Sequence, residues 1–148
     1  MRMRLLASTD FALRVLMLLA ADVSGRPLSV EALATALGGL SRNHLHKIVQ
    51  TLGALGLVRT TRGAGGGVML AVAAADIRVG TLVRQLEQDQ AVVECFRGDG
   101  CDCTLMAQCR LRGFLKSAEA EFYQTLDQFT VADCQVGLSQ SAALSTVL

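Results

Sequence analysis

The sequence has little of what interrupts helices and few of the largest aromatic side chains. Its 148 residues include one proline, one tyrosine and no tryptophan, and aromatic residues make up 4% of the chain. Because proline breaks helices, its near absence favours a helix-rich fold. Apolar residues account for 51%, which is enough for a buried core, and the length suits one domain or one small domain with an appendage.

Long hydrophobic runs are also missing, and no stretch of the sequence is long enough to span a membrane. The start Met1-Arg2-Met3-Arg4 is followed by apolar residues, as in a signal peptide, but Asp10 and Arg14 interrupt the apolar stretch. We therefore expect no signal peptide and a cytoplasmic location. Thiols stay reduced there, so clustered cysteines favour metal or redox chemistry over structural disulfides.

A net charge of +1 hides an uneven distribution of charge along the chain. Residues 1–70 carry eight Arg or Lys against three Asp or Glu, a net of +5, whereas residues 71–148 carry six against ten, a net of −4. The first half therefore suits an anionic partner such as nucleic acid, and the second half suits another task.

Three helices are predicted ahead of residue 57. The first starts at Ser8-Thr9-Asp10, where hydroxyls and a carboxylate suit a helix N-terminus, and it ends near Asp22. Ser29 caps a second, short helix, and Ser41 caps a third whose apolar residues recur at three- and four-residue spacing. Gly38-Gly39 makes a tight turn between them, so the pair has the signature of a helix-turn-helix.

A β-hairpin is predicted directly after these helices. Apolar-rich segments at 57–61 and 67–70 flank the glycine-rich sequence Arg62-Gly63-Ala64-Gly65-Gly66. A helix-turn-helix followed at once by a hairpin is a winged helix. The glycines of the hairpin are expected either to let the backbone approach DNA closely or to form a flexible turn.

Polar and basic residues gather where a winged helix contacts DNA. The N-terminal residues of a recognition helix reach base edges in the major groove, and a basic wing suits the minor groove or a phosphate. A solvated helix face would explain the helix residues in isolation, and the basic hairpin that follows favours DNA. The predicted DNA-contacting residues are Ser41, Arg42, Asn43, His44, Lys47, Arg59, Arg62, Gly63 and Gly66.

Four of the five cysteines fall between Cys95 and Cys109, in a segment rich in glycine and aspartate. The gaps of five, one and five residues match a zinc site poorly, and a Cys101–Cys103 disulfide would leave the other two cysteines unexplained. Unrelated buried thiols are disfavoured by the polar neighbours. An iron–sulfur cluster tolerates longer loops between thiolates and fits best, and spacing alone does not separate Cys101 from Cys103.

The rest of the second half is predicted to be helical. A near-heptad apolar stripe indicates a dimerisation helix. The stripe consists of Leu111, Leu115, Ala118, Phe122, Leu126 and Phe129. The predicted fold is mainly α, with a winged helix-turn-helix, a long dimerisation helix and a cysteine-rich cluster loop. Its parts are the winged helix-turn-helix at 1–75, a connecting helix at 76–92, the cluster-binding loop at 93–110, the dimerisation helix at 104–130, and a short helix with a tail at 131–148.

These motifs resemble those of the Rrf2 family of winged-helix, iron–sulfur cluster-binding transcriptional repressors, over roughly residues 3–135. The stretches that carry the resemblance are 8–14, 40–48, 62–68 and 103–111. The sequence Ser41-Arg42-Asn43-His44 is similar to the NsrR type, which senses nitric oxide. The IscR type has a histidine ligand where this sequence has Arg112, and the gap from Cys95 to Cys103 also resembles the iron-responsive RirA type.

The resemblance implies a homodimeric repressor that carries an iron–sulfur cluster, 4Fe-4S rather than 2Fe-2S. Nitric oxide would nitrosylate the cluster and release a palindromic operator. The implied ligands are Cys95, Cys103 and Cys109, with Cys101 as an alternative, and Asp10 from the partner subunit. By its position alone, Asp10 is a carboxylate at a helix start, and the resemblance is what makes it a ligand.

Three other interpretations stay open or are disfavoured. An iron- or cluster-status-responsive repressor of the same fold is one alternative, and a redox or electron-transfer protein with a cluster is another. An enzyme is disfavoured because neither His44 nor His46 has a nearby nucleophile or carboxylate pair.

Arg14, one helical turn after Asp10, is expected to hold the carboxylate of Asp10 or to offset the charge of the cluster.

Overall fold

The computed structural model describes residues 5–98 and 102–134, so the predicted alternative ligand Cys101 and the predicted tail lie outside the described residues. Its helices are α1 (Ala7–Ala21), α2 (Val30–Ala36), α3 (Arg42–Ala54), α4 (Val79–Leu86) and α5 (Arg110–Leu126), and its strands are β1 (Val58–Thr61) and β2 (Gly67–Leu70). Short 3-10 helices lie at Ala74–Asp76, Glu94–Phe96 and Met106–Gln108. The predicted fold class, mainly helical with a two-stranded wing, is confirmed.

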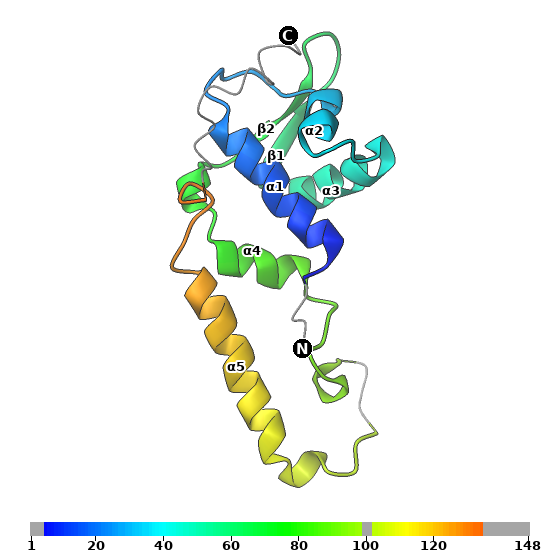
Figure 1. Ribbon diagram of the computed structural model, residues 1–148, viewed down its shortest axis with the longest axis vertical. Helices are drawn as coiled ribbons and strands as arrows, with labels where there is room; N and C mark the ends of the chain where they lie inside the picture. Colours follow the sequence, from blue (N-terminus) through cyan, green and yellow to red (C-terminus); the bar gives the residue numbers. More distant parts are fainter. Residues whose placement is uncertain (1–4, 99–101, 135–148) are drawn as a thin grey trace. The chain divides into compact units, whose positions relative to one another are not determined.

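The chain divides into two compact units, each considered by itself. Unit 1 contains the described residues up to Ile77 and from Thr130 onward, and unit 2 is Arg78–Phe129. Helices α1, α2 and α3 lie together with the wing in unit 1, and unit 2 contains α4 and α5 (Figure 1). Among the described helices, none is long and apolar enough to cross a membrane.

Unit 1 is built around aliphatic side chains from its three helices and its wing. Leu16 of α1, Leu33 of α2, Leu45 of α3 and Val68 of β2 are all at most 1% exposed. The three- and four-residue spacing in α3 places its apolar residues on one buried face, as predicted. Burial of this face fixes how α3 presents its opposite, polar face to solvent.

The predicted caps of α2 and α3 are confirmed. The Ser29 hydroxyl accepts a hydrogen bond from the Ala32 amide at 3.0 Å, and the Ser41 hydroxyl accepts one from the His44 amide at 3.3 Å. Gly56 follows the end of α3 with a φ of +73°, a conformation that glycine adopts without strain. Local chemistry therefore sets both ends of the recognition helix.

Two predicted helix starts are wrong. Helix α1 begins at Ala7 with no side-chain cap, and Thr9 is a buried residue inside the helix rather than a cap. Helix α5 begins at Arg110, because the chain before it forms a 3-10 helix and is extended at its last cysteine. At the start of the predicted C-terminal helix, the Thr130 hydroxyl accepts a hydrogen bond from the Asp133 amide at 3.4 Å, and the Asp133 carboxylate accepts from the amide and hydroxyl of Thr130, as in a helix cap. The chain turns at 131–134, and the rest of that predicted helix lies outside the described residues.

Unit 2 is a pair of packed helices whose register is set at one end. An added Cβ at Gly80 would overlap the backbone carbonyl of Tyr123, so the two helices approach closely there. The carboxylate of Asp127 accepts hydrogen bonds from the amide and the hydroxyl of Thr81, at 2.6 and 3.1 Å. The pKa of Tyr123 is raised overall. Burial raises it most, the nearby carboxylates of Glu119 and Glu87 raise it further, and the guanidinium of Arg84 opposes them with a smaller effect.

Candidate DNA-binding surface and cysteine site

The polar start of α3 lies on the surface of unit 1. Ser41, Arg42, Asn43 and Lys47 are exposed, whereas His44 is half-buried. These residues occupy the first two turns of a helix whose other face is buried, so their side chains are held on a rigid frame. Such a frame suits direct contact with base edges.

The wing presents basic residues but uses its glycines for packing within the chain. Arg59, Arg62 and Gly63 are exposed. An added Cβ at Gly66 would overlap the carbonyl of Thr61, and one at Gly67 would overlap the carbonyl of Leu28. These two glycines therefore allow close approach of the backbone to itself, and this need explains them without any DNA contact.

The wing is also joined to the helix-turn-helix. Leu28, two residues before α2, forms an antiparallel bridge with Val68 of β2 through two backbone hydrogen bonds of 2.9 and 2.8 Å. Strands β1 and β2 pair antiparallel, with Val58 opposite Leu70. The hairpin is thereby attached to the chain that leads into α2, which fixes it relative to the recognition helix.

Side chains on α1 connect the predicted ligand Asp10 to the recognition helix. Arg14 binds Asp10 through two contacts, Nη2 to Oδ2 at 2.7 Å and Nε to Oδ1 at 3.1 Å. The Arg14 guanidinium lies 5.5 Å from the centre of the Phe11 ring, and that ring meets the His44 ring edge-on at 5.9 Å. The sequence predicted the pair of Asp10 and Arg14 but gave no sign of Phe11, whose contact depends on how two helices pack.

The described residues of the cysteine segment lie near the surface of unit 2. Cys103 is exposed, and Cys95 and Cys109 are half-buried. Cys95 lies in a 3-10 helix, and Cys109 is the residue that precedes α5.

One contact brings the two ends of this segment toward each other. The Arg112 guanidinium lies 5.9 Å from the centre of the Phe96 ring, next to Cys95 in sequence. Arg112 is three residues after Cys109, so the contact links the turn of the first cysteine to the helix that follows the last. The sequence singled out Arg112 only as the position where the IscR type has a ligand.

The cysteine segment contains the type of side chain that binds iron–sulfur clusters, but its described side chains are not grouped around one point. Thiolates are the usual ligands of such clusters. Within residues 5–98 and 102–134, however, no three His, Cys, Asp or Glu side chains are grouped closely enough to hold a metal ion.

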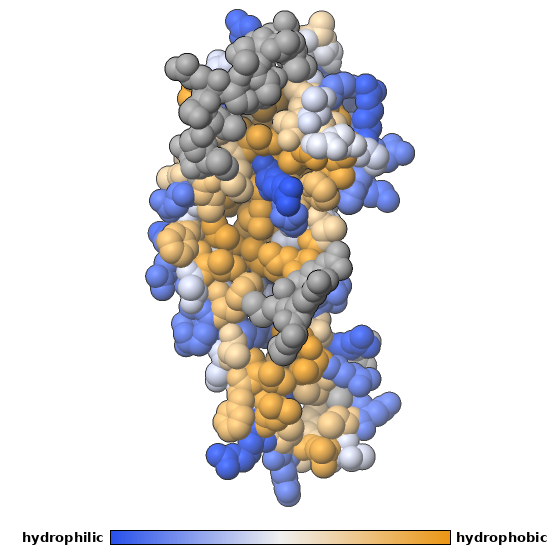
Figure 2. Space-filling model, viewed as in Figure 1, coloured by the Kyte–Doolittle hydropathy of each residue, from blue (hydrophilic) through white to orange (hydrophobic). Residues whose placement is uncertain are grey.

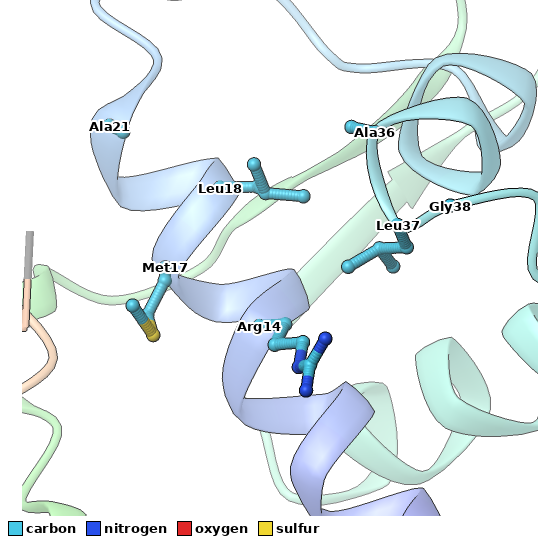
Figure 3. Close-up of a pocket in the computed structure, with 7 residues that line it drawn as sticks. All are labelled: Arg14, Met17, Leu18, Ala21, Ala36, Leu37 and Gly38. Atoms are coloured by element: carbon cyan, nitrogen blue, oxygen red, sulfur yellow. The ribbon is translucent and has the colours of Figure 1, made fainter. Parts of the chain in front are cut away.

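Unit 1 also contains a cavity of about 340 Å³ between α1 and the end of α2. In Figure 3, Leu18 and Leu37 point toward each other across it. Arg14 is the charged residue among those that line it, and the lining is otherwise Met, Leu, Ala and Gly. The cavity thus lies beside the contact of Arg14 with Asp10 and contains none of the predicted DNA-contacting residues.

The helix-turn-helix, its wing and the exposed polar start of α3 define a winged-helix DNA-binding protein. Residues 5–135 match the model of the Rrf2 family, described as iron-dependent transcriptional regulators, so the chain belongs to the Rrf2 family. It is a transcriptional regulator, not an enzyme.

Individual relatives narrow this assignment to the NsrR type. The chain is 40% identical over 146 residues to the transcriptional regulator NsrR of Geobacillus kaustophilus, covering 99% of this chain and 97% of that one. It is 42% identical over 132 residues to the transcriptional repressor NsrR of Streptomyces coelicolor, covering 88% and 87%. The T. potens IscR structure shares the fold, with a TM-score of 0.67, 24% identity and coverage of 89% and 85%.

Proposed function

We propose that this chain is a homodimeric repressor that binds a palindromic operator while it carries an iron–sulfur cluster. Nitric oxide would react with the cluster and end operator binding. The observation that carries DNA binding is the exposed polar start of α3 on a capped helix with a buried face. Similarity to NsrR regulators over 99% of the chain supports nitric oxide as the signal, and a site of reduced thiols suits the cytoplasm.

The cluster ligands that we propose are Cys95, Cys103 and Cys109, with Asp10 of the partner subunit as the fourth. A bound cluster, of the 4Fe-4S rather than the 2Fe-2S type, would supply iron that reacts with nitric oxide. A carboxylate is a hard ligand beside three soft thiolates, so Asp10 would be the most easily displaced. Arg14 would then receive the released carboxylate, since the two side chains already pair at 2.7 Å.

Two contacts would carry this exchange to the recognition helix. Arg14 lies over the Phe11 ring, and Phe11 packs against His44 in the first turn of α3. A change of partner at Asp10 would therefore move Arg14 and with it the packing of Phe11 on His44. Since α3 holds the predicted base contacts, a small displacement there would weaken operator binding.

A second copy of the chain is the partner that we propose for α5. None of its residues is buried, and Leu111 and Phe114 are 60% and 62% exposed. Figure 2 shows apolar surface over the end of unit 2 where α5 begins. Pairing two such helices would cover the apolar stripe that the sequence predicts.

The test combines anaerobic absorption spectroscopy with gel-shift titrations for wild type and Asp10→Ala. Wild type should show cluster absorption and lose operator binding as nitric oxide is added. Asp10→Ala should bind the cluster at least about tenfold more weakly, because one of four ligands is missing. Absence of cluster absorption in wild type, or operator binding that survives nitric oxide, would overturn the proposal.

An iron- or cluster-status-responsive repressor of the same fold is the second candidate. The description of the Rrf2 family as iron-dependent regulators favours it. Parallel gel shifts with an iron chelator and with nitric oxide separate the two, because an iron sensor releases DNA at chelator levels that leave a nitric-oxide sensor bound. An electron-transfer protein is less well supported, because electron transfer does not explain the exposed polar residues at the start of the recognition helix.

A further inference from the structure

Arg42, the first residue of α3, is paired with a carboxylate from the preceding helix. Its Nη2 atom lies 2.6 Å from Oε1 of Glu31 on α2. The two side chains are 67% and 54% exposed. Exposed ion pairs of this kind add little to folding stability, typically below about 1 kcal/mol. The main effect of the pair is therefore on the position and the charge of the guanidinium.

Both residues of the ion pair lie in the first turn of a helix that is capped by a serine. Glu31 is in the first turn of α2, which is capped by Ser29, and Leu33 of that helix is buried. Arg42 follows the Ser41 cap of α3. The ion pair therefore spans the turn of the helix-turn-helix between two fixed points and holds the guanidinium at one place on the protein surface.

Arg42 is the exception among the predicted DNA-contacting cations. In the part of the chain that the structure describes, no carboxylate lies within ion-pair distance of Lys47, Arg59 or Arg62. Those three side chains keep their full charge for phosphates. Arg42 has its charge offset at the position from which a recognition helix reaches base edges.

We infer that Glu31 is a positioning residue that makes Arg42 selective for its base. This inference rests on the proposed contact of α3 with DNA. By holding one side of the guanidinium, Glu31 leaves the remaining N–H groups to bind a base edge, most suitably the N7 and O6 acceptors of guanine. By offsetting the charge, it removes the attraction that Arg42 would otherwise have for any phosphate.

The substitution Glu31→Gln tests this, because it keeps the shape of the side chain and removes its charge. The operator is defined by selecting duplexes from a randomised pool with anaerobically purified wild-type protein, and a scrambled duplex gives non-specific binding. In Glu31→Gln, binding to the scrambled duplex should strengthen, and the ratio of specific to non-specific affinity should fall about tenfold. For the scrambled duplex, the slope of log affinity against log salt concentration should steepen by roughly 0.9, because Arg42, released from Glu31, would contact one more phosphate.

Two controls separate positioning from bracing or from a change in net charge. Asp76→Asn removes one carboxylate charge in the same way at an exposed residue outside α3, the wing and α5, and should leave both affinities unchanged. In the background Arg42→Ala, Glu31→Gln should no longer alter the affinity ratio or the salt slope. Equal loss of specific and non-specific binding with an unchanged slope would mean that Glu31 only braces α2 against α3, and would overturn the inference.

The same experiment distinguishes failure of the inference from failure of the proposed function. If wild type selects no sequence from the pool, DNA recognition itself fails and the role of Glu31 falls with it. If wild type selects an operator and Glu31→Gln behaves like Asp76→Asn, only the role of Glu31 is wrong.

Discussion

The recognition helix and the cysteine segment are both proposed to bind a partner, but they are built in opposite ways. Helix α3 has a side-chain cap and a buried face, with Leu45 and Leu52 at 0% exposure. None of the described residues at 88–98 and 102–109 is buried. The recognition helix is therefore shaped by the protein's own core, whereas the described part of the cysteine segment has no buried residue that could shape it in the same way.

The largest effect on operator affinity is expected from a substitution in the cysteine segment. Cys109→Ser replaces a proposed thiolate ligand in a segment none of whose described residues is buried. If Cys109 is a cluster ligand as proposed, we expect loss of cluster absorption and a fall of operator affinity to the non-specific level, at least about 1000-fold. Anaerobic absorption spectroscopy and gel shifts measure both.

The matched control for this prediction is Cys134→Ser, a half-buried cysteine that is not among the proposed ligands. It should keep both the absorption and the operator affinity. Wild-type operator affinity in Cys109→Ser would show that DNA binding does not depend on the cysteine segment.

A smaller effect, on the free energy of unfolding, should distinguish the packed core of unit 1 from the exposed cysteine segment. Leu16→Ala empties a site in the core of unit 1 that is 0% exposed, and should lower the free energy of unfolding by about 3–5 kcal/mol. Leu105→Ala, in the cysteine segment at 71% exposure, should change it by less than about 0.5 kcal/mol. Urea unfolding followed by circular dichroism measures both, and similar losses would remove the contrast between the regions.

The smallest effect concerns the cap of the recognition helix. Ser41→Ala removes the hydroxyl that accepts from the His44 amide, which should cost about 1 kcal/mol. Ser8→Ala should cost nothing comparable, because α1 begins at Ala7 and has no side-chain cap. Thermal unfolding of the two variants checks this, and a larger loss for Ser8→Ala would restore the predicted helix start.

Features that depend on neighbouring residues could be predicted from the sequence. The caps at Ser29 and Ser41, the glycine that ends α3 and the hairpin all follow from chemistry within a few residues. The pair of Asp10 and Arg14 was also predictable, since residues four apart on a helix share a face. The start of α1 was not, because tertiary burial of Thr9 outweighs its tendency to cap.

Contacts between elements could not be predicted in this way. Glu31 and Arg42 meet across the turn, and Phe11 meets His44 from another helix. No periodicity marks these side chains, since each contact depends on the crossing of two helices. The arrangement of the cysteines is a further case, because their spacing suggests shared ligands but not whether the chain alone brings them together.

The close approach of the two helices in unit 2 has a consequence for how the cysteine segment can vary. Gly80 and Thr81 meet Tyr123 and Asp127, so the alignment of α4 against α5 is fixed at the end opposite the connection between them. We therefore expect the alignment of α4 and α5 to survive insertion or removal of residues in that connection. A change in the sequence of the cysteine segment would then alter the groups it offers to a ligand while the packing of α4 on α5 stays the same.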